Sequence, residues 1–202
     1  LIKDNDLNYQ DSDGNPVLQL LNSSNVVVEG NLITTSDSSN YSNGIVIGDA
    51  STGHVIRDNL ITGDVNNDGI GVVLSSSNGA ISDITITGNT IENSNINGIQ
   101  INSDNGSSID NITIEYNVVD NHDSGVVIAG ELSTNIDVNN NNIINNTSAG
   151  VRTALSAPEV DASNNWWGTT DATVVETDLT EGSVVITPIK DSEISTAGSD
   201  ME

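Results

Sequence analysis

Two loops of the sequence carry oxygen-bearing side chains at every second position, the spacing of a calcium-binding turn. These residues are Asp64, Asn66 and Asp68 in DVNNDG (64–69), and Asp11, Asp13 and Asn15 in DSDGN (11–15). In an EF-hand loop, alternating oxygens and a glycine at a sharp turn wrap a hard cation. The first loop departs from that motif because Ser75 stands where the bidentate Glu would be. We therefore predict Ca²⁺ at these loops, with ordinary Asp-Asn-Gly turns as the alternative.

A second kind of chemistry needs two carboxyl groups, and Asp137 and Asp161 are the weak candidates for it. They hold the same place in successive copies of a repeat described below, so they are expected one coil apart. A glycoside hydrolase holds its two carboxyl groups about 5 Å or about 6.5–9.5 Å apart, on either side of the scissile bond. The sequence places no third acid or aromatic sugar-binding surface beside this pair. Solvated aspartates or a cation site are therefore favoured over catalysis.

The two histidines add little to the case for catalysis. His54 falls at an inward position of the repeat and is expected to be packed or hydrogen-bonded. His122 lies in the loop DNHDSG (120–125) beside Asp120 and Asp123, a grouping that suggests a weak metal or acid–base cluster. Turn chemistry explains this loop better, so neither histidine is predicted to be catalytic.

Both tryptophans of the chain stand together in SNNWWGT (163–169), although the chain has no Phe and only three Tyr. Trp167 takes a position that Ile or Val holds in most other copies of the repeat, so it is expected to close the end of the core. Trp166 points the opposite way and is expected to lie under residues 171–179. It is also a weak candidate for stacking on a ligand.

Composition excludes several function classes. Asp and Glu number 29 against 4 Lys and Arg, which gives a net charge of −25. Such a surface does not bind nucleic acid through a basic face and is not attracted to anionic lipid. There is no cysteine for a disulfide or a thiolate metal site, and no apolar stretch approaches the ~18 residues of a membrane span. In the complete copies of the repeat described below, Arg57 is the only basic residue among the outward-facing strand positions. A polyuronate lyase is therefore disfavoured, because the acidic surface would repel its substrate.

One eight-residue frame recurs through the chain: apolar, any, apolar, any, any, Asn, any, apolar. VVVEGNLI (26–33) and ITITGNTI (84–91) are complete examples. The aligned asparagines, 24 to 30 residues apart, are Asn5, Asn31, Asn59, Asn89, Asn117, Asn141 and Asn165. Each copy carries short segments of period two and is too short for a helical crossover, so none can bury its inward face alone. Stacked copies bury it in a solenoid of parallel strands, about 4.8 Å apart.

The sequence therefore predicts an all-β chain, a right-handed parallel β-helix (solenoid) of about seven coils. The asparagines are expected to form a ladder, each side-chain amide bonding to its equivalent one coil away. A shorter run, Asn93, Asn121 and Asn145, is expected to stack in the same manner. Because an unpaired buried amide costs ~1–3 kcal/mol, the ladder fixes the register of the coils.

The chain resembles the right-handed parallel β-helix repeat proteins, a superfamily of extracellular and cell-surface proteins and of polysaccharide-cleaving enzymes. Many β-helix surface proteins end, like residues 165–168 here, in Asn-Trp-Trp-Gly followed by a short helix and a strand. We expect coils over residues 1–167, a C-terminal capping helix and strand over 168–190, and a polar tail or linker over 191–202. The first coil has no such cap, which predicts removed upstream sequence or end-to-end self-association at that coil.

Asn-x-Ser/Thr sequons include those at Asn22, Asn105, Asn111, Asn145 and Asn146. Several are expected by chance in a chain so rich in Asn, Ser and Thr. They carry weight only if the source glycosylates its surface proteins.

Function is predicted from the fold and the composition together. The leading hypothesis is a noncatalytic, calcium-binding β-helix module, secreted or at the cell surface, that acts as a rigid structural or adhesive element. Polysaccharides or surface proteins are its expected partners, without nucleic acid or membrane insertion. One alternative is a polysaccharide lyase, glycoside hydrolase or polysaccharide-binding module that uses the outward sheet face. Another is a subunit of an end-to-end extracellular filament.

Overall fold

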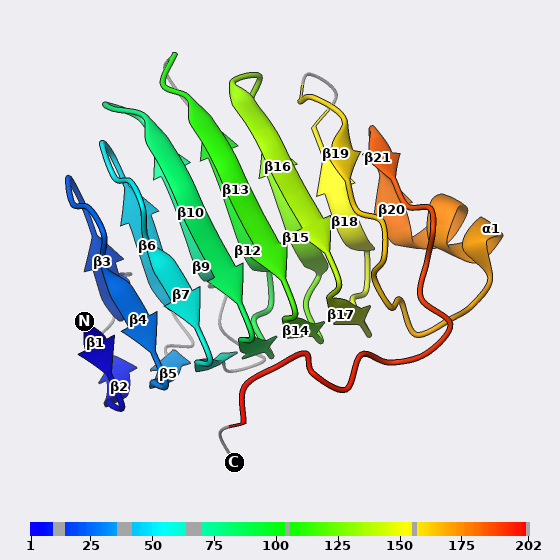
Figure 1. Cartoon of the computed structure of the whole chain (residues 1–202), viewed down its shortest axis with the longest axis horizontal. Coiled ribbons are helices and arrows are strands. Elements are labelled where there is room, and N and C mark those ends of the chain that lie inside the picture. Colours follow the sequence, from blue (N-terminus) through cyan, green and yellow to red (C-terminus); the bar gives the residue numbers. More distant parts are fainter. Residues whose placement is uncertain (10–14, 36–41, 64–69, 104–105, 155–156, 201–202) are drawn as a thin grey trace.

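Three parallel β-sheets run the length of the molecule and form one β-helix (Figure 1). The computed structural model describes residues 1–9, 15–35, 42–63, 70–103, 106–154 and 157–200. Equivalent strands of successive coils pair in parallel in each sheet. This architecture confirms the predicted parallel β-helix, and sheets of eight, six and seven strands are close to the predicted seven coils.

The sheets are named A, B and C, and their strands are given in spatial order. Sheet A contains β1 (Ile2–Lys3), β4 (Val27–Glu29), β7 (Val55–Arg57), β10 (Ile81–Thr87), β13 (Ile109–Glu115), β16 (Ser133–Asn139), β19 (Val160–Asp161) and β21 (Val184–Val185). Sheet B contains β2 (Asp6–Tyr9), β5 (Leu32–Thr35), β8 (Leu60–Gly63), β11 (Thr90–Glu92), β14 (Val118–Asp120) and β17 (Asn142–Ile144). Sheet C contains β3 (Leu18–Leu20), β6 (Ile45–Gly48), β9 (Ile70–Ser76), β12 (Asn97–Ser103), β15 (Ser124–Ala129), β18 (Ala149–Thr153) and β20 (Thr180–Glu181).

The core is a set of columns of β-branched side chains inside the coil. Period-two alternation turns one residue of each pair inward, and the parallel register places equivalent residues above one another. One fully buried column in sheet A is Val28, Ile56, Ile86, Ile114 and Val138. Burying each such side chain stabilises the fold by about 1.5–3 kcal/mol. The interior is therefore packed with side chains rather than hollow.

The predicted asparagine ladder is present and runs through all seven aligned residues. In each of its six links, the side-chain amide nitrogen donates to the Oδ1 atom of the next asparagine at 2.9–3.1 Å. The backbone N–H of the same donor residue bonds to that Oδ1 atom at 2.7–3.0 Å. From Asn31 to Asn141, the amide nitrogen also donates to two backbone carbonyl groups, as Asn59 does to Val28 and Arg57. Each of these side chains therefore joins three coils.

The left-handed turn that the ladder requires lies one residue before each asparagine. The seven preceding residues all have positive φ, between 54° and 65°: Asp4, Gly30, Asp58, Gly88, Tyr116, Asn140 and Asn164. The left-handed residue is thus the neighbour of each ladder asparagine and not the asparagine itself. An αL residue bends the chain sharply between sheets A and B. The bend turns the following amide inward, where it can reach the next coil.

The C-terminal segment covers the last coil. A short helix, α1 (Ala172–Val174), continues into a π-helical turn, η1 (Val175–Leu179), whose Val175 is fully buried. Asp171 caps α1 by accepting the backbone N–H of Thr173 at 2.9 Å. The strands β20 and β21 then extend sheets C and A by one strand each. Among the described segments, no helix has the length and apolarity to span a bilayer.

Residues 191–200, expected to be a polar tail or linker, fold back along sheet B (Figure 1). The side chain of Asn142 bonds to both the carbonyl oxygen (3.0 Å) and the N–H (2.9 Å) of Ile194. Further along, the N–H of Gly198 donates to the carbonyl of Tyr116 at 2.8 Å. The N–H of Ser199 donates to the hydroxyl of Thr90 at 3.0 Å. The tail therefore crosses three coils.

Candidate functional site

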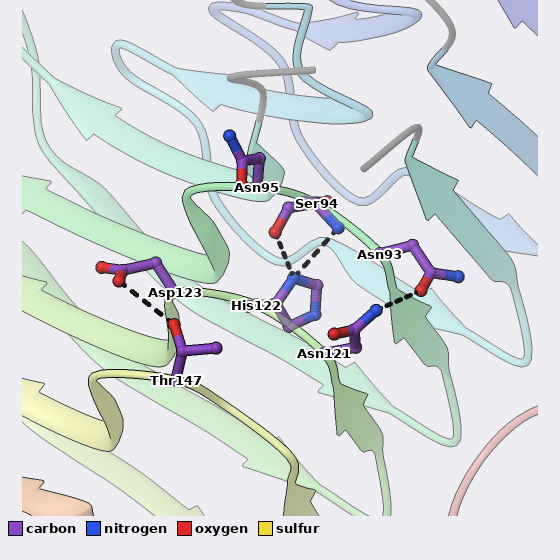
Figure 2. Close-up of a pocket in the computed structure, with 7 residues that line it drawn as sticks. All are labelled: Asn93, Ser94, Asn95, Asn121, His122, Asp123 and Thr147. Carbon is purple, nitrogen blue, oxygen red and sulfur yellow. Dashed lines mark hydrogen bonds between the residues drawn. The ribbon is translucent and has the colours of Figure 1, made fainter. Parts of the chain in front are cut away.

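A polar cavity of about 160 Å³ opens where the chain turns from sheet B to sheet C. Figure 2 shows its lining, which comes from three successive coils. The lining residues are Asn93, Ser94, Asn95, Asn121, His122, Asp123 and Thr147. This cavity contains the histidine and one aspartate of the loop that the sequence singled out.

His122 is 2% exposed and acts as a link between coils. Its Nε2 atom lies 3.0 Å from the carbonyl oxygen of Ile91, and its Nδ1 atom is within reach of the Ser94 N–H, so we assign the proton to Nε2, the tautomer that satisfies both groups. Its Nδ1 atom accepts the backbone N–H of Ser94 at 3.2 Å and lies 3.0 Å from the Ser94 carbonyl (Figure 2). The ring thus bonds to a backbone N–H and a backbone carbonyl of the preceding coil, as an asparagine side chain does in the ladder.

The same column continues into the next coil through a true asparagine. The Oδ1 atom of Asn146 accepts the backbone N–H of His122 at 3.1 Å, and its amide nitrogen donates to the carbonyl of Val119 at 3.3 Å. Ser94, His122 and Asn146 therefore occupy equivalent places in a second inter-coil ladder. The sequence reasoning missed this column, although its signal is visible: each member directly follows one of the asparagines in the run Asn93, Asn121 and Asn145.

That run itself stacks only in part. The amide of Asn121 donates to Oδ1 of Asn93 at 2.7 Å, whereas the amide of Asn145 donates to the carboxylate of Asp120 at 2.8 Å. All three residues adopt positive φ and lie at the surface of the turn. The continuous column is therefore the one beside them, through His122.

His54 has a similar role in the N-terminal half. It is fully buried at the predicted inward position, and its Nδ1 atom accepts the backbone N–H of Val26 at 3.0 Å. Its Nε2 atom lies 3.3 Å from the hydroxyl of Ser23. Burial lowers the pKa of both imidazoles, because the charged form loses its hydration. For His122, the Ile91 and Ser94 carbonyls and Asp120 oppose this effect on the pKa without reversing it. Both rings are therefore neutral links.

The carboxylate of Asp123 also holds neighbouring coils together. It accepts the hydroxyl of Thr147 at 3.4 Å and a short hydrogen bond from the hydroxyl of Ser148. The backbone N–H groups of Thr147 and Ser148 bond to the carbonyls of His122 and Asp123, so the whole turn is fastened to the next one. The structure thus favours the turn interpretation of this loop over a metal or acid–base cluster.

Asp137 and Asp161 lie opposite each other in the parallel pairing of β16 and β19, one coil apart as expected. Partial burial raises the pKa of Asp161, but its hydrogen bonds outweigh that effect and the pKa is lowered. Its Oδ1 atom accepts the backbone N–H of Ser163 at 2.9 Å and the amide of Asn139 at 3.4 Å. A glycosidase acid needs a raised pKa. The environment of Asp161 therefore favours a turn-closing carboxylate.

The residues of the two predicted calcium loops fall mostly outside the described part of the chain. Asp11, Asp13, Asp64, Asn66 and Asp68 all lie outside it, and Asn15 is the one member inside it. Within the described ranges, no three His, Asp or Glu residues gather closely enough to hold a metal ion. The calcium hypothesis therefore rests on the sequence pattern.

The two tryptophans occupy different environments. Trp167 is 3% exposed and packs in the core, where its ring approaches Gly150 so closely that a Cβ atom there would lie 2.8 Å from it. Its indole N–H has no hydrogen-bond partner among the described residues. Trp166 is partly exposed and pairs with Asn142 at the end of sheet B. A ligand role thus remains a hypothesis for Trp166 alone.

Comparison with known protein families identifies the family of this chain. The family model described as "NosD: Periplasmic copper-binding protein (NosD)" matches residues 2–184, which include every strand of the three sheets except the last residue of β21. The chain belongs to the NosD family. The periplasmic setting of NosD proteins agrees with the predicted location outside the cytoplasm. Searches of curated proteins and of solved structures gave no match.

The copper of the NosD description can be compared with the donor atoms present. Copper is bound in proteins by imidazole, thiolate and thioether groups. The chain has no cysteine, two histidines and one methionine, Met201, which lies outside the described residues. Both histidines are buried and use their ring nitrogens to join coils. The described residues therefore do not fit a copper site.

Proposed function

We propose that this chain is a noncatalytic β-helix module of the cell exterior that acts as a rigid structural or adhesive element. The observation that carries the proposal is the continuous ladder of seven asparagines, which ties each coil to the next through hydrogen bonds that are buried from Asn31 onward. Losing one of the buried links would leave buried polar groups unpaired, at about 1–3 kcal/mol each. Such a stack resists local opening, which suits a spacer or a display surface.

The outward carboxylates support the same conclusion, because several of them join strands of neighbouring coils. Asp83 accepts the amide of Asn111 at 2.6 Å, and Asp110 accepts the hydroxyl of Thr134 at 2.7 Å. These hydrogen bonds lower the pKa of Asp83 and of Asp110. Carboxylates held ionised in this way are poor general acids near neutral pH.

We propose further that the metal of this chain is a hard cation, calcium, held by the loops at residues 11–15 and 64–69. Oxygen donors at alternate positions support calcium, and the engaged histidines argue against copper at the described residues. Metal-free protein is titrated separately with Ca²⁺ and Cu²⁺ while its melting temperature is followed. Ca²⁺ should raise the melting temperature, and the rise should vanish in Asp64→Asn combined with Asp68→Asn and Asp11→Asn combined with Asp13→Asn. A rise with Cu²⁺ alone would refute this assignment.

The carbohydrate alternative has one observation in its favour. A cavity of about 280 Å³ on the outward face of sheet C is lined by residues that include Val127, Arg152 and Glu181. Arg152 lies 3.7 Å from Glu181 and is partly exposed, so it could meet an acidic sugar over an apolar floor.

A polysaccharide screen separates the two functions. The rigid-module proposal expects no release of reducing ends or unsaturated products from acidic or neutral polysaccharides. Cleavage that disappears in Asp137→Asn combined with Asp161→Asn would overturn it in favour of an enzyme. Binding without cleavage that disappears in Arg152→Ala would support an adhesive role on sheet C.

A further inference from the structure

We propose that Asn22 is a site of N-glycosylation. Asn22-Ser23-Ser24 matches the Asn-x-Ser/Thr acceptor sequence and lies in the turn between β3 and β4. Asn22 and Ser24 are both exposed, and Asn22 adopts a left-handed conformation with φ of 47°. Neither side chain has a hydrogen-bond partner among the described residues. The family's periplasmic setting also places the chain outside the cytoplasm, where such transfer takes place.

The reaction requires a free side-chain amide. Its nitrogen attacks C1 of the first sugar of an oligosaccharide carried on a lipid pyrophosphate. The new N–C1 bond forms as the bond from C1 to the phosphate oxygen breaks, the amide loses one proton, and the lipid pyrophosphate leaves. An amide proton already bonded to a carboxylate must first give up that bond, which is worth about 1.5–3 kcal/mol, or at least about tenfold in availability.

Two other sequons have their amides occupied in this way. The amide of Asn111 donates to Asp83 at 2.6 Å, and its sequon lies within β13, which pairs with strands on both sides. The amide of Asn145 donates to Asp120 at 2.8 Å. Both asparagines are exposed, so exposure alone does not distinguish them from Asn22.

In a further sequon, at Asn146, both ends of the asparagine side chain and the Ser148 hydroxyl are hydrogen-bonded. Its amide oxygen and nitrogen join the column through His122, bonding to the His122 N–H and the Val119 carbonyl. The hydroxyl of Ser148, the third residue of this sequon, bonds to Asp123. The two remaining sequons, at Asn40 and Asn105, have their asparagines outside the described residues.

The backbone around Asn22 is held from one side. The N–H of Asn22 donates to the carbonyl of Asp49 at 2.8 Å, and the carbonyl of Ser23 accepts the N–H of Thr52 at 3.1 Å. Both contacts are with the following coil, so the turn can approach a transferase more readily than a strand paired on both sides. The structure thus ranks Asn22 above the three other described sequons.

The test uses the folded chain, purified without glycan, an oligosaccharyltransferase specific for Asn-x-Ser/Thr, and a lipid-pyrophosphate-linked oligosaccharide. Peptide mass spectrometry measures occupancy at each asparagine. We expect occupancy at Asn22 to exceed that at Asn111 and Asn145 by about tenfold or more, with Asn146 unmodified. Both Asn22→Gln and Ser24→Ala should abolish the main product.

Matched variants test the reason for the ranking. Asp83→Ala should raise occupancy at Asn111, and Asp120→Ala should raise it at Asn145, because each releases an amide. The denatured chain is the control, and it should be modified at Asn111 and Asn145 as readily as at Asn22. That result would verify that the transferase accepts these sequons. Equal occupancy of the three sites in the folded chain, or an unmodified Asn22 beside a modified Asn111, overturns the proposal. Circular dichroism before the reaction verifies that each variant is folded.

Discussion

Replacing His122 by asparagine tests whether the buried imidazole is a neutral link between coils. The substitution keeps an acceptor at the position of Nδ1 and a donor beyond it. Asn146 already forms the equivalent pair of hydrogen bonds in the next coil of the same column. The smaller side chain should lower the free energy of unfolding by about 1 kcal/mol at pH 8, because it leaves a small cavity and weakens the hydrogen bond to the Ile91 carbonyl. The fold itself should be retained.

The pH dependence is the sharper signature. Burial lowers the pKa of His122 in the folded chain, so below about pH 6.5 the unfolded state binds a proton that the folded state does not. The stabilisation is therefore complete above pH 6.5 and is lost as the pH falls from there toward the folded pKa. One such group removes at most about 1.4 kcal/mol per pH unit, or roughly 3–6 °C in melting temperature for a chain of this size. Asp120 and Asp123 are the acidic groups near the ring, and Asp120 opposes the shift.

The assay is thermal unfolding at half-unit steps from pH 8 to pH 5, comparing the chain with His122→Asn. We expect the variant to lose a large part of the fall in melting temperature below pH 6.5. His54→Asn is the matched control and should remove a separate part, because burial also lowers the pKa of His54. A slope in His122→Asn identical to that of the unaltered chain would refute the assignment of His122 as the titrating link.

Three further predictions concern other contacts. Asp49 accepts two backbone N–H groups of the β9–β10 turn, which lowers its pKa to about 2. The stabilising effect of these hydrogen bonds should therefore disappear as the pH falls from about 4 to about 2. Thermal unfolding of Asp49→Ala should lack that acid transition, and an unchanged transition would contradict this. Asn89→Leu, in mid-ladder, should cost about 3 kcal/mol or more by urea denaturation and clearly more than Asn5→Leu in the first coil; equal costs would argue against the ladder. Trp167→Ala should cost about 3–5 kcal/mol as a core truncation. Trp167→Phe should cost much less, because the indole N–H has no partner among the described residues; a cost equal to that of alanine would reveal a missing hydrogen bond.

The fold was predictable because its determinants repeat in the sequence. A period-two pattern states which residues turn inward, and an asparagine in the same frame seven times states how the coils align. The buried position of Trp167 was predictable from the same frame, because Trp167 stands where most other copies have Ile or Val. In each case a local rule recurs often enough to exclude other arrangements.

Other features could not be predicted because they depend on contacts between coils. His122 reads as a turn residue in sequence, and only the stack shows that its ring replaces an amide. The left-handed residue before each ladder asparagine is Asp, Gly, Tyr or Asn, so no single residue type marks it. Asp161 has a suitable spacing for catalysis, but its bonds to Ser163 and Asn139 keep it ionised. Spacing alone does not define the environment of a carboxylate.

Native-state hydrogen exchange measures whether the side-chain links make the β-helix one rigid unit. The backbone N–H groups that donate to the ladder belong to Asn5, Asn31, Asn59, Asn89, Asn117 and Asn141. The backbone amides of the four buried central members, Asn31 to Asn117, should exchange only through global unfolding, with opening free energies equal to the unfolding free energy from urea denaturation. Asn89→Leu should lower all four together. Opening of any of these amides several kcal/mol below the global value would contradict a continuous, rigid ladder.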